Sequence, residues 1–204
     1  MTDIDSVMNA APVIPVLVVD DIAHARPLAE ALVAGGLPVL EVTLRTPVAL
    51  DVITEMAKVP GAIVGAGTVI SSGDLAAALV AGARFVVSPG ITAALGSAAR
   101  TSGVPFLPGV SSASDIIRAQ EMGFNRLKFF PAVAAGGLPM LRALAAPFRN
   151  VRFCPTGGIT LESASEWLAE PAVACVGGSW IAKRGETDWA AIEARARAAA
   201  ALRV

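Results

Sequence analysis

The feature that most constrains the fold is a regular alternation of short apolar runs and longer segments of helical character. Eight β-rich runs occur in order, and each is followed by a segment of helical length rich in alanine or leucine. The expected strands are residues 13–19, 39–45, 63–69, 85–88, 105–110, 126–131, 152–156 and 173–177. The expected helices are residues 23–34, 47–57, 73–81, 92–101, 112–122, 137–146, 161–169 and 188–201. Such alternation indicates a parallel sheet whose strands are joined by crossover helices.

Eight units favour a compact (β/α)8 TIM barrel over an open sheet. The 204 residues allow roughly 25 per unit, whereas a typical barrel has about 250 residues in all. An open flavodoxin-like sheet needs only about five units and would leave the others unexplained. No linker or low-complexity segment divides the chain, so we expect a single domain over residues 1–204. Residues 1–10 are expected to add a short N-terminal helix over the bottom of the barrel.

The start of the second main helix carries a familiar signal. Thr46 is a good N-cap residue, and Pro47 suits the first helical position, where its missing N–H is not needed. The sequence therefore predicts a helix that begins at residue 47.

The composition excludes several classes of protein. Hydrophobic residues make up 54% and charged residues 16%, against about 25% charged in an average domain, which excludes disorder. No apolar run approaches the roughly 20 residues of a membrane-spanning helix. A net charge of −1 supplies no basic field for nucleic acid. The N-terminus lacks the basic and apolar regions of a secretory signal, so a cytoplasmic location is expected.

Scarce residue types narrow the chemistry further. One histidine and no tyrosine exclude a paired-histidine metal site and a tyrosine acid. Cys154 and Cys175 lie far apart in apolar runs, which argues against a disulfide framework or a CxxC metal site. His24 begins a helix and is expected to be solvated. No metal or cofactor is predicted.

Polar side chains interrupt the expected strand 39–45. Alternation places Glu41, Thr43 and Arg45 on one face. Strands of a parallel barrel are buried on both faces, so this polar face is expected to point into the barrel, with Arg45 nearest the C-terminal mouth. Catalytic groups of such barrels lie at that end. The alternatives are a solvent-facing edge strand or a Glu–Arg pair retained for packing.

A lysine in the middle of the expected strand 126–131 is the sharpest exception. Lys128 stands between Leu127 and Phe129. Loss of water disfavours a charged amine, and a cation such as Arg45 would lower its pKa further. A neutral amine can form a Schiff base with a carbonyl substrate. The alternative is a lysine that snorkels to solvent or pairs with Glu41 for stability.

Two glycine-rich turns follow the last two expected strands. Gly157 and Gly158 follow the seventh strand, and Gly177, Gly178 and Ser179 follow the eighth. Loops after strands 7 and 8 of barrels commonly bind phosphate through backbone N–H groups. Ordinary turn chemistry is the alternative interpretation.

Three other residues are expected at strand ends. The segment Gly65-Ala66-Gly67 lacks the third glycine of a dinucleotide fingerprint, so it is a weak signal for NAD. We interpret it instead as a tightly packed strand that delivers Thr68 to the mouth. Pro89 and Phe130 are placed to line a pocket there.

Taken together, these motifs closely resemble the bacterial 2-keto-3-deoxy-6-phosphogluconate (KDPG) aldolases, also called KHG/KDPG aldolases. The resemblance covers nearly the whole chain. Its segments are VLVV at 16–19, EVTLRT at 41–46, GAGTV at 65–69, SPG at 88–90, KFFPA at 128–132, RFCPTGGI at 152–159 and GGSW at 177–180. One departure is Val133, where some members have glutamate.

The resemblance implies a metal-free class I aldolase on a (β/α)8 barrel, commonly a homotrimer. Its substrate is a small phosphorylated 2-keto acid, cleaved to pyruvate and D-glyceraldehyde 3-phosphate in an Entner-Doudoroff-type pathway. By the same resemblance, Lys128 forms the imine at the C2 ketone and Glu41 is the general acid and base. No cofactor is implied beyond this covalent imine.

The resemblance also assigns binding roles. Arg45 and Thr68 hold the substrate carboxylate, while Pro89 and Phe130 flank the pyruvyl part. Thr156 is the candidate for sensing the C4 hydroxyl. The residues assigned to the phosphate are Gly157, Gly158, Gly178 and Ser179.

Several alternatives stay open. The chain could instead be an aldolase for 4-hydroxy-2-oxoglutarate or for the galactonate-derived epimer, because glycine-rich turns do not fix the C4 configuration. A non-catalytic barrel that binds sugar phosphates would keep Lys128, Glu41 and Arg45 as a buried ionic cluster. An isomerase or epimerase would use Glu41 as a base and would tolerate Lys128→Met.

Overall fold

A computed structural model describes residues 3–202. The strands in this part of the chain are β1 (Val13–Leu17), β2 (Val39–Thr43), β3 (Ile63–Gly67), β4 (Val86–Val87), β5 (Phe106–Leu107), β6 (Gly109–Val110), β7 (Arg126–Phe129), β8 (Arg152–Pro155) and β9 (Val176–Gly178). The helices are α1 (Ile4–Asn9), α2 (Ala25–Ala34), α3 (Ala49–Met56), α4 (Ser72–Val80), α5 (Ala93–Ser102), α6 (Ala113–Glu121), α7 (Gly137–Ala145), α8 (Leu161–Leu168) and α9 (Trp189–Ala200). A 3-10 turn, η1 (Ile22–His24), precedes α2.

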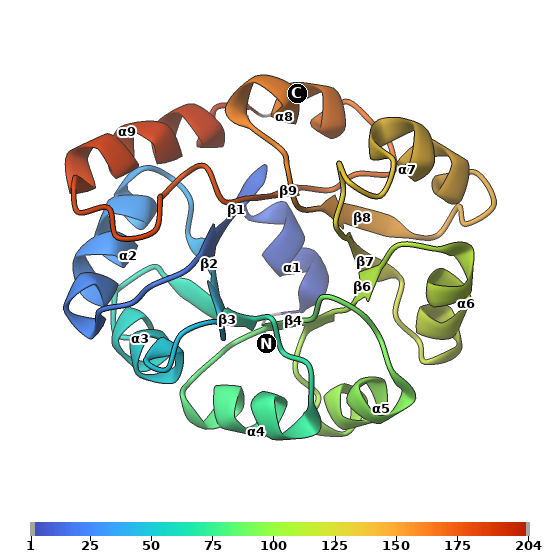
Figure 1. The fold of residues 1–204 in the computed structure, drawn as a ribbon, viewed down its shortest axis with the longest axis horizontal. Helices are drawn as coiled ribbons and strands as arrows, with labels where there is room; N and C mark the ends of the chain where they lie inside the picture. The colour runs from blue at the N-terminus through green and yellow to red at the C-terminus, as the bar shows by residue number, and fades with distance from the viewer. Residues whose placement is uncertain (1–2, 203–204) are drawn as a thin grey trace.

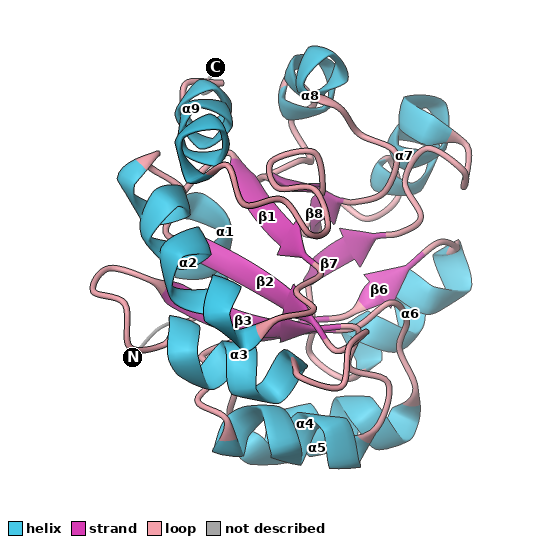
Figure 2. Ribbon diagram, turned by 60° about the vertical axis from the view of Figure 1, so that its left-hand side comes forward, coloured by secondary structure: helices cyan, strands magenta, loops and turns pink. Residues whose placement is uncertain are grey.

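The strands curl into a ring with the helices outside it (Figure 1). Figure 2 shows from the side that the long helices cover the outer face of the strands. The expected N-terminal helix is α1, which lies in the middle of the ring in Figure 1; residues 1–2 of the predicted extension lie outside the described part. The alternation of strands and crossover helices predicted from the sequence is therefore confirmed.

The sheet is parallel throughout but has two parts. Six strands pair in the order β5-β4-β3-β2-β1-β9, and three pair in the order β6-β7-β8. Two isolated bridges, Phe153 with Val173 and Thr156 with Gly177, link β8 and its end to β9 and the residues before it. The parallel α/β fold is thus confirmed, but one continuous eight-stranded sheet is not what the described residues form.

Pro108 divides the fifth expected strand into β5 and β6. Proline has no N–H to donate to a sheet, so the pairing changes partners there. Its carbonyl oxygen still accepts a hydrogen bond of 2.8 Å from the Lys128 N–H. The break between the two sheets therefore lies beside the strand that carries this lysine.

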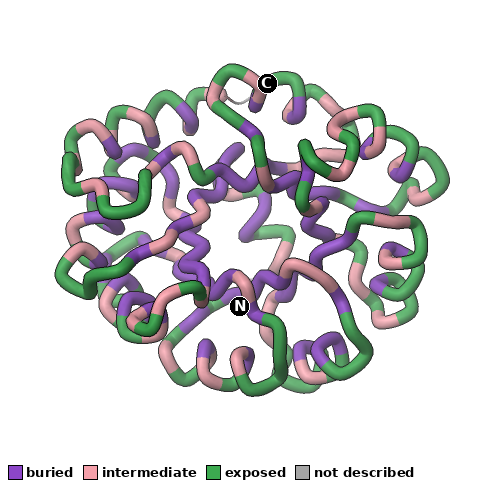
Figure 3. The backbone as a smooth tube through the Cα atoms, in the orientation of Figure 1, coloured by how far each residue is buried: buried purple, intermediate pink, exposed green. Residues whose placement is uncertain are grey.

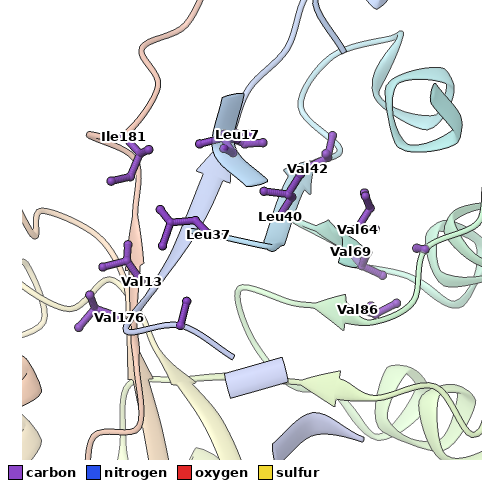
Figure 4. Close-up of a cluster of buried hydrophobic side chains, with 14 of the residues drawn as sticks. Val13, Leu17, Leu37, Leu40, Val42, Val64, Val69, Val86, Val176 and Ile181 are labelled. Atoms are coloured by element: carbon purple, nitrogen blue, oxygen red, sulfur yellow. The ribbon is translucent and has the colours of Figure 1, made fainter. Parts of the chain in front are cut away.

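Two separate hydrophobic cores stabilise the ring. The larger one packs the outer faces of the strands against the helices, as the valine and leucine side chains of Figure 4 illustrate. The smaller one fills one end inside the ring. Its buried members are Val7, Met8, Ile14, Val39, Phe85, Val87, Leu107, Cys154 and Cys175. The strands are buried on both faces, and exposure is concentrated on the surrounding helices and loops (Figure 3).

The predicted start of α3 is wrong. The helix begins at Ala49, and Val48 occupies the N-cap position without a side-chain cap. The hydroxyl of Thr46 instead donates a hydrogen bond of 2.7 Å to the carbonyl oxygen of Val19. This tertiary contact ties the loop after β2 to the end of β1.

Within the described residues, the longest apolar helices fall short of what crossing a bilayer requires.

Candidate active site

Lys128 and Glu41 form a buried ion pair inside the ring. Lys128 lies on β7 and Glu41 on β2, so the pair joins strands of the two different sheets. Its Nζ and Oε1 atoms are 3.0 Å apart, and the residues are 5% and 3% exposed. An amine and a carboxylate held at this distance can exchange a proton without rearrangement.

Gly67 provides the space that the Glu41 carboxyl group occupies. A Cβ atom at Gly67 would lie 2.2 Å from Oε1 of Glu41, which is a direct clash. Gly67 is at the end of β3, next to the strand that carries Glu41. The sequence predicted that Gly65 and Gly67 lie in a tightly packed strand, but it was not clear that Gly67 makes room for Glu41. The signal in the sequence was the period-two alternation that the two neighbouring strands share.

Phe130 directly follows β7, and Pro89 lies in the turn after β4, against Gly109 of β6. The Nζ atom of Lys128 is 5.3 Å from the centre of the half-buried Phe130 ring, within the range of a cation–π contact. Gly109 pairs with Lys128, and a Cβ atom at Gly109 would lie 2.2 Å from the backbone of Pro89. Glycine at this position therefore brings the Ser88-Pro89-Gly90 turn close to the lysine strand.

Arg45 and Thr68 meet at the mouth. The Nε atom of the exposed Arg45 donates a hydrogen bond of 3.3 Å to Oγ1 of Thr68. Thr68 has φ = 60°, and it alone among the described non-glycine residues has a positive φ. Such a conformation is strained for a β-branched residue and is typical of functional sites. It was not visible in the sequence.

Thr156 lies between the ion-pair strand and the last strand. It is buried, and its N–H donates to the carbonyl oxygen of Phe129 at 2.9 Å. A Cβ atom at Gly177 would lie 2.2 Å from Oγ1 of Thr156, so Gly177 makes room for this hydroxyl group. Gly177 thus has a packing role that the sequence did not indicate.

The remaining glycines form two loops at the ends of β8 and β9. Gly157 and Gly158 have φ angles of +106° and +79°, which favour glycine. Gly178 has a packing reason as well, because a Cβ atom there would lie 2.5 Å from the Trp180 ring. Ser179 is exposed at the edge of this loop. The backbone can therefore be approached closely at 157–158.

Cys154 and Cys175, distant in sequence, lie together in the inner core. The neighbouring Cys154 thiol raises the pKa of the Cys175 thiol well above its ordinary value, and burial and the charge of Glu41 act in the same direction. A protonated thiol is neither a nucleophile nor a metal ligand. Among residues 3–202, no three His, Cys, Asp or Glu side chains cluster closely enough to hold a metal ion.

The family model described as KDPG and KHG aldolase matches residues 4–195. The chain belongs to the KDPG and KHG aldolase family. The resemblance seen in the sequence motifs is therefore confirmed. A family relative, the 2-dehydro-3-deoxy-phosphogluconate aldolase of Zymomonas mobilis, is 56% identical over 203 residues, which is 100% of this chain and 98% of the relative.

Solved structures in this aldolase family match closely. The Zymomonas mobilis KDPG aldolase crystallised with 3-phosphoglycerate is 56% identical, with a TM-score of 0.97 over 98% of this chain and 96% of that one. The Legionella pneumophila KDPG aldolase, with pyruvate captured as a covalent carbinolamine, is 47% identical, with a TM-score of 0.95 over 98% and 99%. Both are similar to this chain over essentially its entire length.

Proposed function

We propose that the chain is a class I aldolase that cleaves 2-keto-3-deoxy-6-phosphogluconate to pyruvate and D-glyceraldehyde 3-phosphate. The observation that carries the proposal is the Lys128–Glu41 pair, buried inside the ring at 3.0 Å. The Legionella relative with a pyruvate carbinolamine supports covalent chemistry of this kind. Family membership favours this lyase reaction over the isomerase and the non-catalytic barrel.

Imine formation uses both members of the pair. Proton transfer from Lys128 to Glu41 along their hydrogen bond frees the amine. The amine attacks C2 of the substrate and gives a carbinolamine, and the protonated Glu41 donates a proton as water leaves. The product of this step is an iminium ion on Lys128, with Glu41 again a carboxylate.

Bond cleavage follows from the iminium ion. Glu41 removes the proton of the C4 hydroxyl, and the C3–C4 electron pair moves into the iminium group. Glyceraldehyde 3-phosphate leaves and an enamine of pyruvate remains on Lys128. Protonation of C3 and hydrolysis then release pyruvate and restore the lysine. One carboxylate in reach of the reacting atoms suffices for this proton traffic.

The mouth supplies the carboxylate site. Arg45 is the donor suited to bidentate binding of the C1 carboxylate, and Thr68, already hydrogen-bonded to it, is the second donor. Phe130 and Pro89 form the apolar walls beside the pyruvyl methylene. Thr156, buried between the pair and the glycine loops, is proposed to contact the C4 hydroxyl.

The phosphate is proposed to bind at the loops after β8 and β9. Gly157, Gly158 and Gly178 are proposed to offer backbone N–H groups, and the exposed Ser179 offers a hydroxyl donor. The Zymomonas relative crystallised with 3-phosphoglycerate supports a phosphorylated three-carbon ligand.

Borohydride trapping tests the proposal directly. Incubation with pyruvate and sodium borohydride should add the mass of a reduced pyruvyl group to a peptide that contains Lys128. The same treatment of Lys58→Ala, a change at an exposed lysine, should give the same adduct. An adduct that persists in Lys128→Ala would refute the assignment of the nucleophile.

The family name also covers 4-hydroxy-2-oxoglutarate as a substrate, and the Escherichia coli relative named KHG/KDPG aldolase is 50% identical over 88% of this chain and 85% of the relative. We propose KDPG as the preferred substrate because the glycine loops suit a phosphate. Comparison of kcat/KM for KDPG, its C4 epimer and 4-hydroxy-2-oxoglutarate tests this order.

We further propose that the two sheet segments act as one (β/α)8 barrel in a single domain of residues 1–204. The bridge between Thr156 and Gly177 supports closure on one side, and the Lys128–Glu41 pair ties the segments together across the interior. The homotrimer implied by the resemblance and the cytoplasmic location expected from the N-terminal sequence remain predictions. Sedimentation equilibrium tests the first, and fractionation of cells tests the second.

A further inference from the structure

Gly178 and Ser179, two residues proposed to bind the phosphate, stand at the start of the connection between β9 and α9. Residues 179–188 of this connection form neither helix nor strand (Figure 1). Among the described residues, the backbone of 179–182 forms no hydrogen bond with the backbone of another element. The path of the chain around Ser179 therefore depends on side-chain packing and on hydrogen bonds from side chains.

Arg195 of α9 supplies those hydrogen bonds. Its Nε atom donates at 2.8 Å to the carbonyl oxygen of Ile181, two residues after Ser179. Its Nη2 atom donates at 2.6 Å to Oε2 of Glu186. One guanidinium group thus holds both ends of the segment 181–186 against α9.

Glu186 closes the far end of this segment into a turn. Its Oε2 atom also accepts a hydrogen bond of 3.1 Å from the N–H of Lys183, and its own N–H donates one of 3.1 Å to the carbonyl oxygen of Lys183. The hydrogen bond from Arg195 holds the pKa of the Glu186 carboxyl below its ordinary value, so this group stays an ionised acceptor. The turn is therefore fixed to Arg195 as a unit.

The contacts of Arg195 differ from those of the other ion pair on α9. The side chains of Arg195 and Glu186 are 29% and 19% exposed, whereas those of Arg197 and Glu193 are 66% and 35% exposed. A planar guanidinium group with two partly buried acceptors is held in one orientation, while an exposed pair within one helix restrains little.

We propose that Arg195 is a positioning residue for the proposed phosphate site: its guanidinium group, bonded to Ile181 and Glu186, holds the connection after β9 so that Gly178 and Ser179 face the phosphate. This inference rests on the proposed function, because it takes these two residues as phosphate donors. A loop that is ordered before binding loses less conformational entropy when the ligand arrives. Arg195 acts through this loop and has no contact with the substrate.

The test is Arg195→Met, which keeps a long side chain and removes the guanidinium group. KM for KDPG should rise about tenfold, the size expected for loss of a charge-assisted hydrogen bond, whereas kcat at saturating KDPG should stay close to that of the parent chain. KM for the dephosphorylated counterpart 2-keto-3-deoxygluconate should not change. Trapping of pyruvate by borohydride should also be unaffected, because pyruvate has no phosphate.

Two further variants isolate the role of the two hydrogen bonds. Arg195→Lys keeps the charge, but its single nitrogen cannot span Ile181 and Glu186 as the two guanidinium nitrogens do, so its KM for KDPG should lie between those of the parent chain and Arg195→Met. Arg197→Met removes the same charge from the same helix, where the arginine pairs only with Glu193, and should leave KM for both substrates unchanged.

Four results would overturn the inference. They are an unchanged KM for KDPG in folded Arg195→Met, an equal rise for Arg197→Met, an equal rise for both substrates, and a fall in kcat without a rise in KM. If Arg195→Met does not fold, Arg195→Lys decides, and an unchanged KM for KDPG in that variant overturns the inference. If the parent chain itself does not prefer KDPG to 2-keto-3-deoxygluconate, the proposed phosphate site fails, and this result is separable from those of the variants.

Discussion

The two ends of the ring interior differ in polarity although the same strands build both. One end is filled by the inner core, which comprises apolar side chains and two cysteine thiols and is covered by α1. The other end holds Lys128, Glu41 and Thr156, all buried and polar. The change is abrupt: along β2, Val39 belongs to the inner core and Glu41, two residues later, belongs to the ion pair.

This difference separates the side chains that stabilise the fold from those proposed for the chemistry, although both sets point into the ring. On β8, Cys154 likewise faces the inner core, and Thr156 follows two residues later at the mouth. Because alternate residues of a strand point to the same face, a step of two moves a side chain along the ring interior and leaves its direction unchanged. We call the buried residues Lys128, Glu41 and Thr156 the polar layer. Substitutions in the polar layer should therefore lower the catalytic rate, and those in the inner core should lower the stability of the fold.

The largest effect on rate is expected for Lys128→Met. Loss of the nucleophile should lower kcat/KM for KDPG by at least about 10⁴-fold, as the removal of other covalent nucleophiles does. The variant also leaves Glu41 buried without its partner, which costs about 3–5 kcal/mol of unfolding free energy. Pyruvate release and urea denaturation measure the two effects.

A double variant separates the two effects. Lys128→Met with Glu41→Leu removes both charges, so stability should return to or exceed that of the parent chain while activity stays absent. Lys58→Met, at an exposed lysine paired with Glu55, is the matched control and should change neither quantity appreciably. Measurable aldolase turnover by folded Lys128→Met would show that Lys128 is not the nucleophile.

Glu41→Gln should have the next largest effect. The amide keeps the shape and can still accept a hydrogen bond from Lys128, but it cannot take up a proton. Loss of general acid–base catalysis is expected to lower kcat by about 10²–10⁴-fold. The rate of borohydride-trapped adduct formation with pyruvate should fall with kcat, and an unchanged rate would show that another group moves the proton.

A substitution in the inner core should give the opposite pattern. Phe85 is fully buried there, and Phe85→Ala should cost about 3–5 kcal/mol of unfolding free energy because it leaves a cavity. The phenyl ring of Phe85 packs against Gly65, which has no side chain to fill the cavity that the substitution leaves. Activity per folded molecule, measured well below the melting temperature, should stay close to that of the parent chain. A large loss of kcat without unfolding would show that the two ends are coupled.

The sequence predicted most of this comparison. Alternating runs gave the strand and helix order, and the period-two pattern of 39–45 placed Glu41 and Thr43 on the buried inner face. A lysine between large apolar residues identified Lys128. These features are local, because the alternation and burial of side chains along a strand can be seen in the order of neighbouring residues.

The parts that escaped prediction depend on contacts between distant segments. The space for Glu41 comes from Gly67 and that for Thr156 from Gly177, and each contact needs the register of two strands. The hydroxyl of Thr46 donates to Val19, just after β1, and does not cap α3. The positive φ of Thr68 is likewise a property of the folded mouth and not of its neighbours in sequence.

The smallest effect expected concerns the thiols of the inner core at alkaline pH. Contact with Cys154, burial and the charge of Glu41 all raise the pKa of Cys175 in the folded chain above its ordinary value of 9.0. Below that pH both folded and unfolded thiols keep their protons, so the thiol contributes its full stability. As the pH rises past 9.0, the Cys175 thiol of the unfolded chain ionises before that of the folded chain, which favours unfolding.

The melting temperature of the parent chain should therefore fall more between pH 8 and pH 10 than that of Cys175→Val, whose side chain does not ionise. Activity of the variant at neutral pH should be close to that of the parent chain, because the thiol is protonated and lies in the inner core. Identical pH profiles of melting would mean that Cys175 is as free to ionise in the folded chain as in the unfolded one. The inner core would then be as accessible to charge as the mouth, and the contrast between the two ends would not hold.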